Sequence, residues 1–413
     1  MKKTLLTICL VWMCFSLSAQ KIIDLSGKWS FSIDRQDNGE KEKWFSHTLN
    51  DFINLPGSMP EKLKGDEVTA KTQWTGSLYD SSYYYNPYME KYRKEGNIKF
   101  PFFLTPDKHY VGAAWYQKEV NIPADWKGER ILLFLERPHI ETTVWVNGQK
   151  TGMQNSLCVP HQYDITRYVR PGKCTITIRV DNRIKEINVG PDSHSITDQT
   201  QGNWNGIVGR ICLQTTPKTY FDDIQIYPEP EQKLARVKVV IKGTGTAKVK
   251  LSAESFNTDK KHIVPAIQQE IKLNKGVTET EMVLPMGNDM LLWDEFHPAL
   301  YKLKAEVTNG KKTEIKEIQF GMRRFEIKGK WFYVNGRKTQ LRGTVENCDF
   351  PLTGYAPMDV ESWERVFRIC RNYGLNHMRF HSFCPPEAAF MAADRVGFYL
   401  QPEGPSWPNH GPK

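Results

Sequence analysis

The hydrophobic residues of this chain follow two different periods, and the change between them constrains the fold more than any other feature. From residue 23 to about residue 320, short runs alternate apolar and polar side chains. One face of each run is then buried and the other meets water, which predicts antiparallel sheets packed face to face. The alternation is clearest in three runs: Trp29, Phe31 and Ile33; Ile131, Leu133 and Leu135; and Ile176, Ile178 and Val180.

This all-β region is expected to form two modules. Residues 20–217 are predicted to be one β-sandwich, and residues 218–325 a second sandwich with the size of an immunoglobulin domain. Within the first module, residues 77–99 are crowded with Tyr and charged residues and show little periodicity. We expect a long insertion loop there, at a candidate binding face.

After residue 330 the apolar period becomes helical. One helix is predicted from a cap at Asp359 to a stop at Gly374, and a second over residues 387–396 with a stop at Gly397. Strands are predicted on either side of the second helix, which indicates parallel βαβ units. The helices alone leave open whether these units begin a TIM barrel or an open doubly wound sheet. No glycine-rich phosphate loop follows these strands, which counts against a nucleotide-binding sheet.

Residues 1–19 are typical of an export signal. Lys2 and Lys3 precede the apolar run Leu5–Leu17, and Ser18-Ala19 supplies a small-residue cleavage site. The run is too short to span a bilayer. Cys14 lacks the small residues that precede a lipidated cysteine, so a soluble exported protein is favoured over a lipoprotein. We therefore expect a periplasmic or extracellular location and no membrane span.

Composition narrows the partners. The formal net charge is +9, but the basic residues form no long block, so nucleic acid is not the expected partner. The aromatic content of 12% fits both sugar stacking and sandwich cores. The cysteines match no zinc spacing, and the sequence predicts neither a metal site nor a cofactor. Cys158 with Cys174 is the cysteine pair that the sequence suggests testing for a disulfide.

In a βα barrel the functional site lies at the carboxyl ends of the strands. Charged groups, an imidazole and an indole suit sugar hydroxyls and sugar rings, and an internal Arg–Glu ion-pair network is the competing interpretation. Glu346 and Glu403 could also be weighed as a catalytic carboxylate pair, although nothing in the sequence singles them out. The candidates at the strand ends are Arg342, Glu346, Arg379, His381, Glu403 and Trp407.

The motifs that follow one another along the chain resemble those of glycoside hydrolase family 2, which contains β-galactosidases, β-glucuronidases and β-mannosidases. Each motif is weak alone, but together they keep the family order. They are Leu25-Ser26-Gly27-Lys28-Trp29, Val144-Trp145-Val146-Asn147-Gly148, Trp204-Asn205-Gly206-Ile207, Phe320-Gly321-Met322-Arg323, Leu341-Arg342-Gly343, and Asn376-His377-Met378-Arg379.

The resemblance implies a mainly β, multidomain fold: a sugar-binding jelly roll, an immunoglobulin-like sandwich, and at 326–413 the first units of a TIM barrel. It implies a retaining β-glycosidase acting on β-linked carbohydrate, and it adds Asn205 to the candidate sugar contacts. Val345 and Asn347 stand where the family usually shows Asn and His, which leaves the sugar open.

The resemblance also places the family's acid/base and nucleophilic glutamates after the fourth and seventh barrel strands. Because only three such strands are predicted here, we assign no catalytic residue to this chain and expect no turnover by it. A truncated product of a longer reading frame is the favoured explanation. A partner that supplies the rest of the barrel, or a poorly folded tail, are the others. The alternative function is a non-catalytic carbohydrate-binding or accessory protein.

Overall fold

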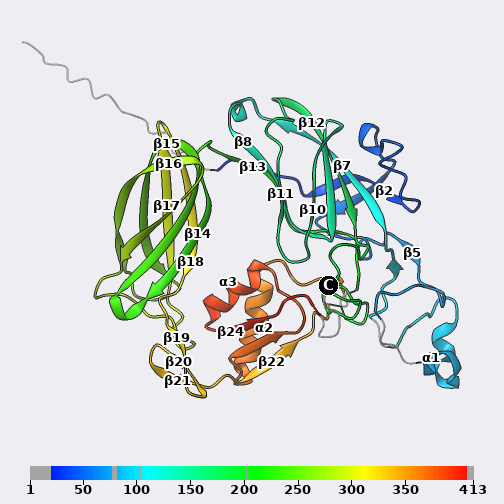
Figure 1. Cartoon of the computed structure of the whole chain (residues 1–413). Helices are drawn as coiled ribbons and strands as arrows, with labels where there is room; N and C mark the ends of the chain where they lie inside the picture. The colour runs from blue at the N-terminus through cyan, green and yellow to red at the C-terminus, as the bar shows by residue number, and fades with distance from the viewer. Residues whose placement is uncertain (1–19, 77–80, 102–103, 201, 351, 407–413) are drawn as a thin grey trace, which may run out of the picture.

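The computed structural model describes residues 20–76, 81–101, 104–200, 202–350 and 352–406. The expected export signal lies outside these residues. The described part is mainly β and consists of an N-terminal sandwich, a middle β domain and a C-terminal βα unit (Figure 1). No described helix is long and apolar enough to cross a membrane.

The N-terminal sandwich packs two antiparallel sheets around one core. The first sheet has the order β10-β9-β12-β7-β2-β3, and the second has the order β1-β13-β8-β11 with β4 beside β13. Alternate side chains from both sheets, such as Trp29, Leu133 and Ile178, are buried between them. The strands are β1 (Ile22–Asp24), β2 (Gly27–Asp34), β3 (Asp51–Leu55), β4 (Gly57–Ser58), β7 (Ala113–Ile122), β8 (Arg130–His139), β9 (Glu141–Val146), β10 (Gln149–Asn155), β11 (His161–Asp164), β12 (Gly172–Asp181) and β13 (Gly206–Thr216).

The insertion expected over 77–99 contains short helices where it is described. These are α1 (Ser82–Tyr85) and the 3-10 helix η2 (Pro87–Arg93), which lie at one end of the molecule in Figure 1. Pro87 opens η2, and the Asn86 side chain accepts the backbone N–H of Tyr88. The expectation of an irregular loop is therefore wrong for this part. The small sheet β5 (Asp66–Glu67) and β6 (Lys108–His109) and the 3-10 helices η1 (Trp44–Ser46) and η3 (Ala124–Trp126) complete the domain.

The middle domain is one antiparallel sheet that folds over its own core. The 23-residue strand β15 (Leu234–Phe256) pairs with β14 (Tyr220–Glu229) along its first half and with β17 (Leu300–Asn309) along its second half. A register shift at Gly243/Gly245 lies between the two halves and lets the strand change direction. The remaining elements are η4 (Pro230–Gln232), β16 (Ile263–Pro285) and β18 (Lys312–Phe320).

A three-stranded meander then leads into the βα unit. The parallel sheet has the order β22-β23-β24, with α2 and α3 packed on it. Trp363 and Phe367 of α2, and the alanines of α3, form the buried helix faces. The elements are β19 (Phe325–Lys328), β20 (Trp331–Val334), β21 (Arg337–Thr339), β22 (Gly343–Glu346), α2 (Val360–Asn372), β23 (His377–Phe380), α3 (Glu387–Val396) and β24 (Tyr399–Pro402).

The helix ends confirm the local sequence predictions. The Asp359 side chain caps α2 by accepting the backbone N–H of Ser362 at 2.7 Å. The second helix spans the predicted residues and is followed by Gly397 with φ 76°, a conformation that favours glycine. These two predictions succeeded because caps and stops are encoded within one turn of the chain.

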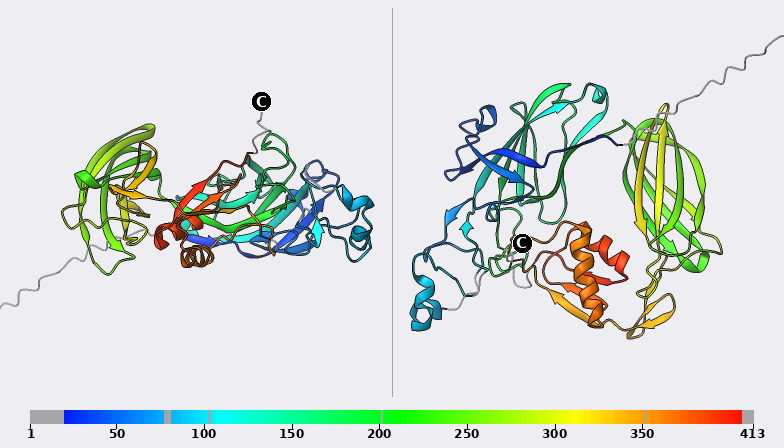
Figure 2. Two further views of the ribbon diagram at one scale, coloured as in Figure 1. Left: turned by 90° about the horizontal axis from the view of Figure 1, so that it is seen from below. Right: turned by 180° about the vertical axis from the view of Figure 1, so that it is seen from behind.

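The βα unit lies between the other two domains (Figures 1 and 2). Toward the middle domain, the Trp293 indole N–H donates to the carbonyl of Asp394 at 2.7 Å. Toward the sandwich, the Ser195 hydroxyl donates to the carbonyl of Ser382 at 2.8 Å. The carboxyl ends of the parallel strands therefore meet a loop of the N-terminal sandwich.

Candidate functional site

Four of the predicted residues gather at one edge of the parallel sheet. The register pairs Glu346 with Phe380 and Phe380 with Pro402, so the three strands end together. His381 and Glu403 directly follow these ends. We call Glu346, Arg379, His381 and Glu403 the strand-end cluster.

Arg379 and Glu403 bind each other within this cluster. The Arg379 Nε lies 2.5 Å from Glu403 Oε1, and Glu403 Oε2 accepts the backbone N–H of Ser382 at 2.9 Å. Burial raises the pKa of Glu403, but these donors outweigh it and the pKa is lowered overall. Glu403 is therefore an ionised carboxylate that orients Arg379 and the Ser382 turn, as the ion-pair interpretation expected.

Glu346 has the opposite environment. One carboxylate oxygen accepts the backbone N–H of Cys348 at 2.9 Å, while Oε2 is buried without a hydrogen-bond partner among the described residues. Burial raises the pKa of Glu346 to about 7. A carboxyl group that holds a proton near neutral pH can donate a hydrogen bond to a sugar oxygen, which an ordinary glutamate cannot.

The N-terminal sandwich supplies one wall beside the cluster. The segment 191–200, which we call the sandwich loop, contacts the strand ends through consecutive side chains. The hydroxyls of Ser193 and Ser195 donate to carbonyls of the βα unit, and the rings of His194 and His381 meet edge to face at 4.2 Å. The sequence gave no periodic pattern over this loop, so its role was not predicted.

A cavity of about 220 Å³ opens between the sandwich and the loop that follows β22. Trp204 is 3% exposed and stacks on His139 at 4.5 Å, yet its indole N–H has no acceptor among the described residues. Other lining residues are Leu104, His109, Tyr110, Asp198 and Thr353. An aromatic wall, carboxylates and an unpaired donor are suited to binding a sugar.

The structure separates three other predicted residues from this site. Arg342 precedes β22 and lies at the opposite end of the sheet, where its Nε donates to the carbonyl of Gly374 at 2.7 Å. The prediction that it lies at the carboxyl ends is wrong, because the strand begins one residue after it. Trp407 lies outside the described residues.

Asn205 is a structural residue of the sandwich. It is 0% exposed, and its amide donates to the carbonyls of Gly112 and Val180 at 2.9 and 3.0 Å. Its amide oxygen accepts the Tyr116 hydroxyl at 2.7 Å. With every polar atom of the side chain engaged inside the protein, the predicted sugar contact by Asn205 is contradicted.

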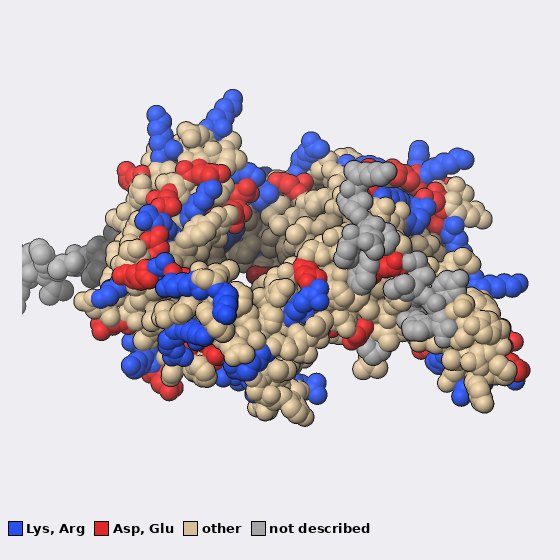
Figure 3. All heavy atoms as spheres, turned by 60° about the horizontal axis from the view of Figure 1, so that its bottom comes forward, with Lys and Arg blue, Asp and Glu red and all other residues tan. Residues whose placement is uncertain are grey.

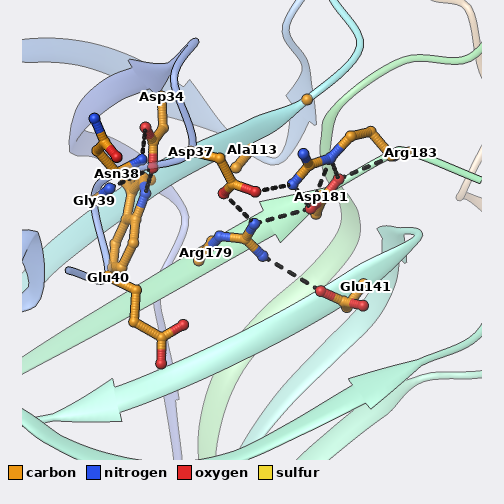
Figure 4. A network of polar contacts seen from close by, with 12 residues as sticks. Asp34, Asp37, Asn38, Gly39, Glu40, Ala113, Glu141, Arg179, Asp181 and Arg183 are labelled. Carbon is orange, nitrogen blue, oxygen red and sulfur yellow. Dashed lines mark hydrogen bonds and ion pairs between the residues drawn. The ribbon is translucent and has the colours of Figure 1, made fainter. Parts of the chain in front are cut away.

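The densest ion-pair network lies elsewhere in the sandwich (Figure 4). Arg179 contacts three carboxylates, those of Asp37, Glu141 and Asp181, and Arg183 also binds Asp37 and Asp181. Lys185 adds a third cation at 2.7 Å from Asp181. The three acids are thus balanced by three bases, so the network holds strands and termini together and leaves no net charge for a ligand.

The described residues contain no group of three or more His, Cys, Asp or Glu side chains that could hold a metal ion. On the face shown in Figure 3, acidic and basic side chains are intermingled. This distribution matches the scattered charge of the sequence and shows no continuous basic surface on that face.

Comparisons with known proteins decide the family. Residues 22–217 match the profile "Glycosyl hydrolases family 2, sugar binding domain", and residues 219–323 match "Glycosyl hydrolases family 2". The chain belongs to glycosyl hydrolase family 2. The family resemblance seen in the sequence motifs is thereby confirmed.

Its relatives include a β-galactosidase of Thermoanaerobacter pseudethanolicus, 24% identical over 76% of this chain and 42% of the relative. A β-glucuronidase of Paenibacillus borealis is 23% identical over 94% of this chain and 59% of the relative. This family 2 chain thus spans about half the length of the curated relatives it matches.

Solved structures share its fold. A family 2 member from Bacteroides cellulosilyticus has a TM-score of 0.66 at 20% identity, covering 93% of this chain and 47% of the other. A β-glucuronidase from Ruminococcus gnavus, in complex with D-glucaro-d-lactam, has a TM-score of 0.67 at 20% identity. The latter alignment covers 94% of this family 2 chain and 60% of the other.

Proposed function

We propose that this chain is the substrate-recognising front part of an exported β-glycosidase that hydrolyses O-glycosyl bonds in carbohydrate. In this proposal the N-terminal sandwich is a sugar-binding jelly roll, and the middle domain is an immunoglobulin-like sandwich. Residues 326–413 are the first units of a TIM barrel. The export signal at 1–19 directs the protein to the periplasm or the exterior, where β-linked oligo- or polysaccharide is its partner.

The observation that carries the proposal is the contact of the sandwich loop with the strand-end cluster. A domain matched as sugar-binding contributes Ser195 and His194 to the edge where a βα barrel holds its substrate. The nearby cavity adds a half-enclosed space with an aromatic wall. Two domains that share one wall are suited to binding a glycan that touches both.

Within this site the chain's own residues have separable roles. Glu403 holds Arg379, and Arg379 presents its remaining guanidinium N–H groups to sugar oxygens. Glu346 in its protonated form donates a hydrogen bond, and the indole of Trp204 offers a further donor. We assign neither the nucleophile nor the acid/base group of a retaining mechanism to these residues.

The test is turnover and binding measured on the same preparation. Nitrophenyl β-galactoside, β-glucuronide and β-mannoside are assayed for hydrolysis, and β-linked oligosaccharides are titrated calorimetrically. We expect binding without hydrolysis, and roughly tenfold weaker binding for His381→Ala. His297→Ala, at a side chain that is 81% exposed on the middle domain, is the matched control.

Clear hydrolysis would contradict the assignment and would direct attention to Glu346 and Glu403 as the carboxylate pair. Absence of binding to all oligosaccharides would contradict the proposed recognition role. Binding that His381→Ala leaves unchanged would move the sugar site away from the strand ends. A non-catalytic carbohydrate-binding protein remains the alternative function, and a gene sequence that stops after residue 413 in the native genome would favour it.

A further inference from the structure

Two thiols from different domains meet beside the strand-end cluster. Cys158 lies in the loop between β10 and β11 of the sandwich, and Cys384 lies between β23 and α3 of the βα unit. Both are free thiols in the structure. The guanidinium of Arg137 donates to the carbonyl of Cys384 at 3.1 Å and to the carbonyl of Cys158 at 3.4 Å. One planar group therefore holds the two cysteine backbones side by side.

The sulfur atoms face the same space. Cys158 and Cys384 both line a cavity of about 720 Å³ between the sandwich and α3. Burial raises the pKa of the Cys158 thiol, and the Arg137 charge and the backbone N–H of Cys384 oppose this effect at the sulfur. The N–H of one cysteine thus points at the sulfur of the other, which places the side chains in contact.

We propose that Cys158 and Cys384 form a disulfide that joins the N-terminal sandwich to the βα unit. The pair predicted from sequence spacing, Cys158 with Cys174, is not supported, because Cys174 lies in β12 inside the sandwich core. Cys348 is the competing partner, since it is buried near Cys158 in a smaller cavity. Cys384 is favoured over Cys348 because it shares the Arg137 contact.

The reaction is an exchange with a small-molecule or protein disulfide. The Cys158 thiolate attacks one sulfur of the donor, forms a mixed disulfide and releases one donor thiol. The Cys384 thiol then loses its proton, attacks the Cys158 sulfur and releases the second donor thiol. Two protons and two electrons pass to the donor, and one protein disulfide is formed. Such exchange is supported by an oxidising compartment, in line with the proposed export.

The link would fix one wall of the site. Cys384 is two residues from Ser382, whose carbonyl accepts the Ser195 hydroxyl and whose N–H is held by Glu403. A covalent bond at this point keeps the sandwich loop against the strand ends when the weaker polar contacts break. The bond would also stabilise the fold, because it closes a long loop in the unfolded chain.

The experiment uses the full chain, incubated at pH 8.5 with oxidised glutathione as the disulfide donor. Thiols are counted, the protein is alkylated and digested with trypsin, and linked peptides are identified by mass spectrometry. Tryptic peptides 151–167, 380–395 and 343–365 contain Cys158, Cys384 and Cys348 respectively, each with one cysteine. We expect two thiols lost per chain, a link between 151–167 and 380–395, and a thermal midpoint raised by roughly 5 °C.

Variants separate the candidate pairs. Cys348→Ser and Cys212→Ser are expected to keep the link, whereas Cys158→Ser and Cys384→Ser are expected to lose it. A link between 151–167 and 343–365, glutathione retained on Cys158, or an unchanged thiol count in the wild-type chain would each overturn the proposal. The wild-type peptide map is decisive even where a variant fails to fold, and it is independent of glycosidase activity.

Discussion

Substitution of Asn205 by alanine should destabilise the N-terminal sandwich strongly. The side chain makes three hydrogen bonds, to the carbonyls of Gly112 and Val180 and from the hydroxyl of Tyr116, and it is fully buried. Each bond contributes about 1 kcal/mol net, and the partners left unsatisfied in the core add to the cost. We expect a loss of about 3–4 kcal/mol in the free energy of unfolding of this domain.

Hydrogen–deuterium exchange measured at increasing urea concentrations can assign that loss to the sandwich, because β7 and β12 carry the affected carbonyls. Asn155→Ala is the matched control, since its amide contacts Glu186 at the exposed surface and should cost under about 1 kcal/mol. On protein that is still folded, oligosaccharide affinity should be unchanged by Asn205→Ala. A stable variant with weakened sugar binding would refute the structural role and restore Asn205 as a sugar contact.

Three further predictions follow from the site. The pKa of Glu346 is about 7 in the folded chain against 4.5 ordinarily, so the folded state holds the proton more tightly between these values. Stability should therefore fall by up to roughly 3 kcal/mol as pH rises from about 4.5 to 7, and Glu346→Gln should remove this slope from urea titrations. Glu403→Gln should cost about 1 kcal/mol at low salt, with a smaller difference from wild type in 1 M NaCl, because the Arg379 pair is partly exposed. An equal cost at both salt concentrations would contradict an electrostatic role. Trp204→Phe keeps the stacking on His139 but loses the indole donor, so calorimetry should show roughly tenfold weaker oligosaccharide binding with a stability loss of about 1 kcal/mol. Unchanged affinity would remove Trp204 from the site.

Much of the fold was predictable because its determinants are local. The cap at Asp359, the stop at Gly397 and the alternation of β2 act within a few residues, and the structure confirms them. The insertion shows a limit of this approach. Its Pro87 was visible in the sequence, but the surrounding aromatic and charged residues hid the short helices.

The site was less predictable because it depends on contacts between distant segments. Strand order placed Glu346, His381 and Glu403 at one edge, since parallel strands share their carboxyl ends. The sandwich loop carries no apolar period, and its docking on Ser382 follows from tertiary packing. Arg342 was misplaced because the boundary of a strand shifted by one residue moves a side chain to the other end of the sheet.

The central claim is that the sandwich loop and the strand ends form one glycan site. Hydrogen–deuterium exchange of the full chain, with and without a saturating β-linked oligosaccharide, tests this most directly. We predict that the ligand slows exchange in segments 191–204 and 381–403 together. Slower exchange confined to one of these segments, or located only in the middle domain, would contradict a site shared between the two domains.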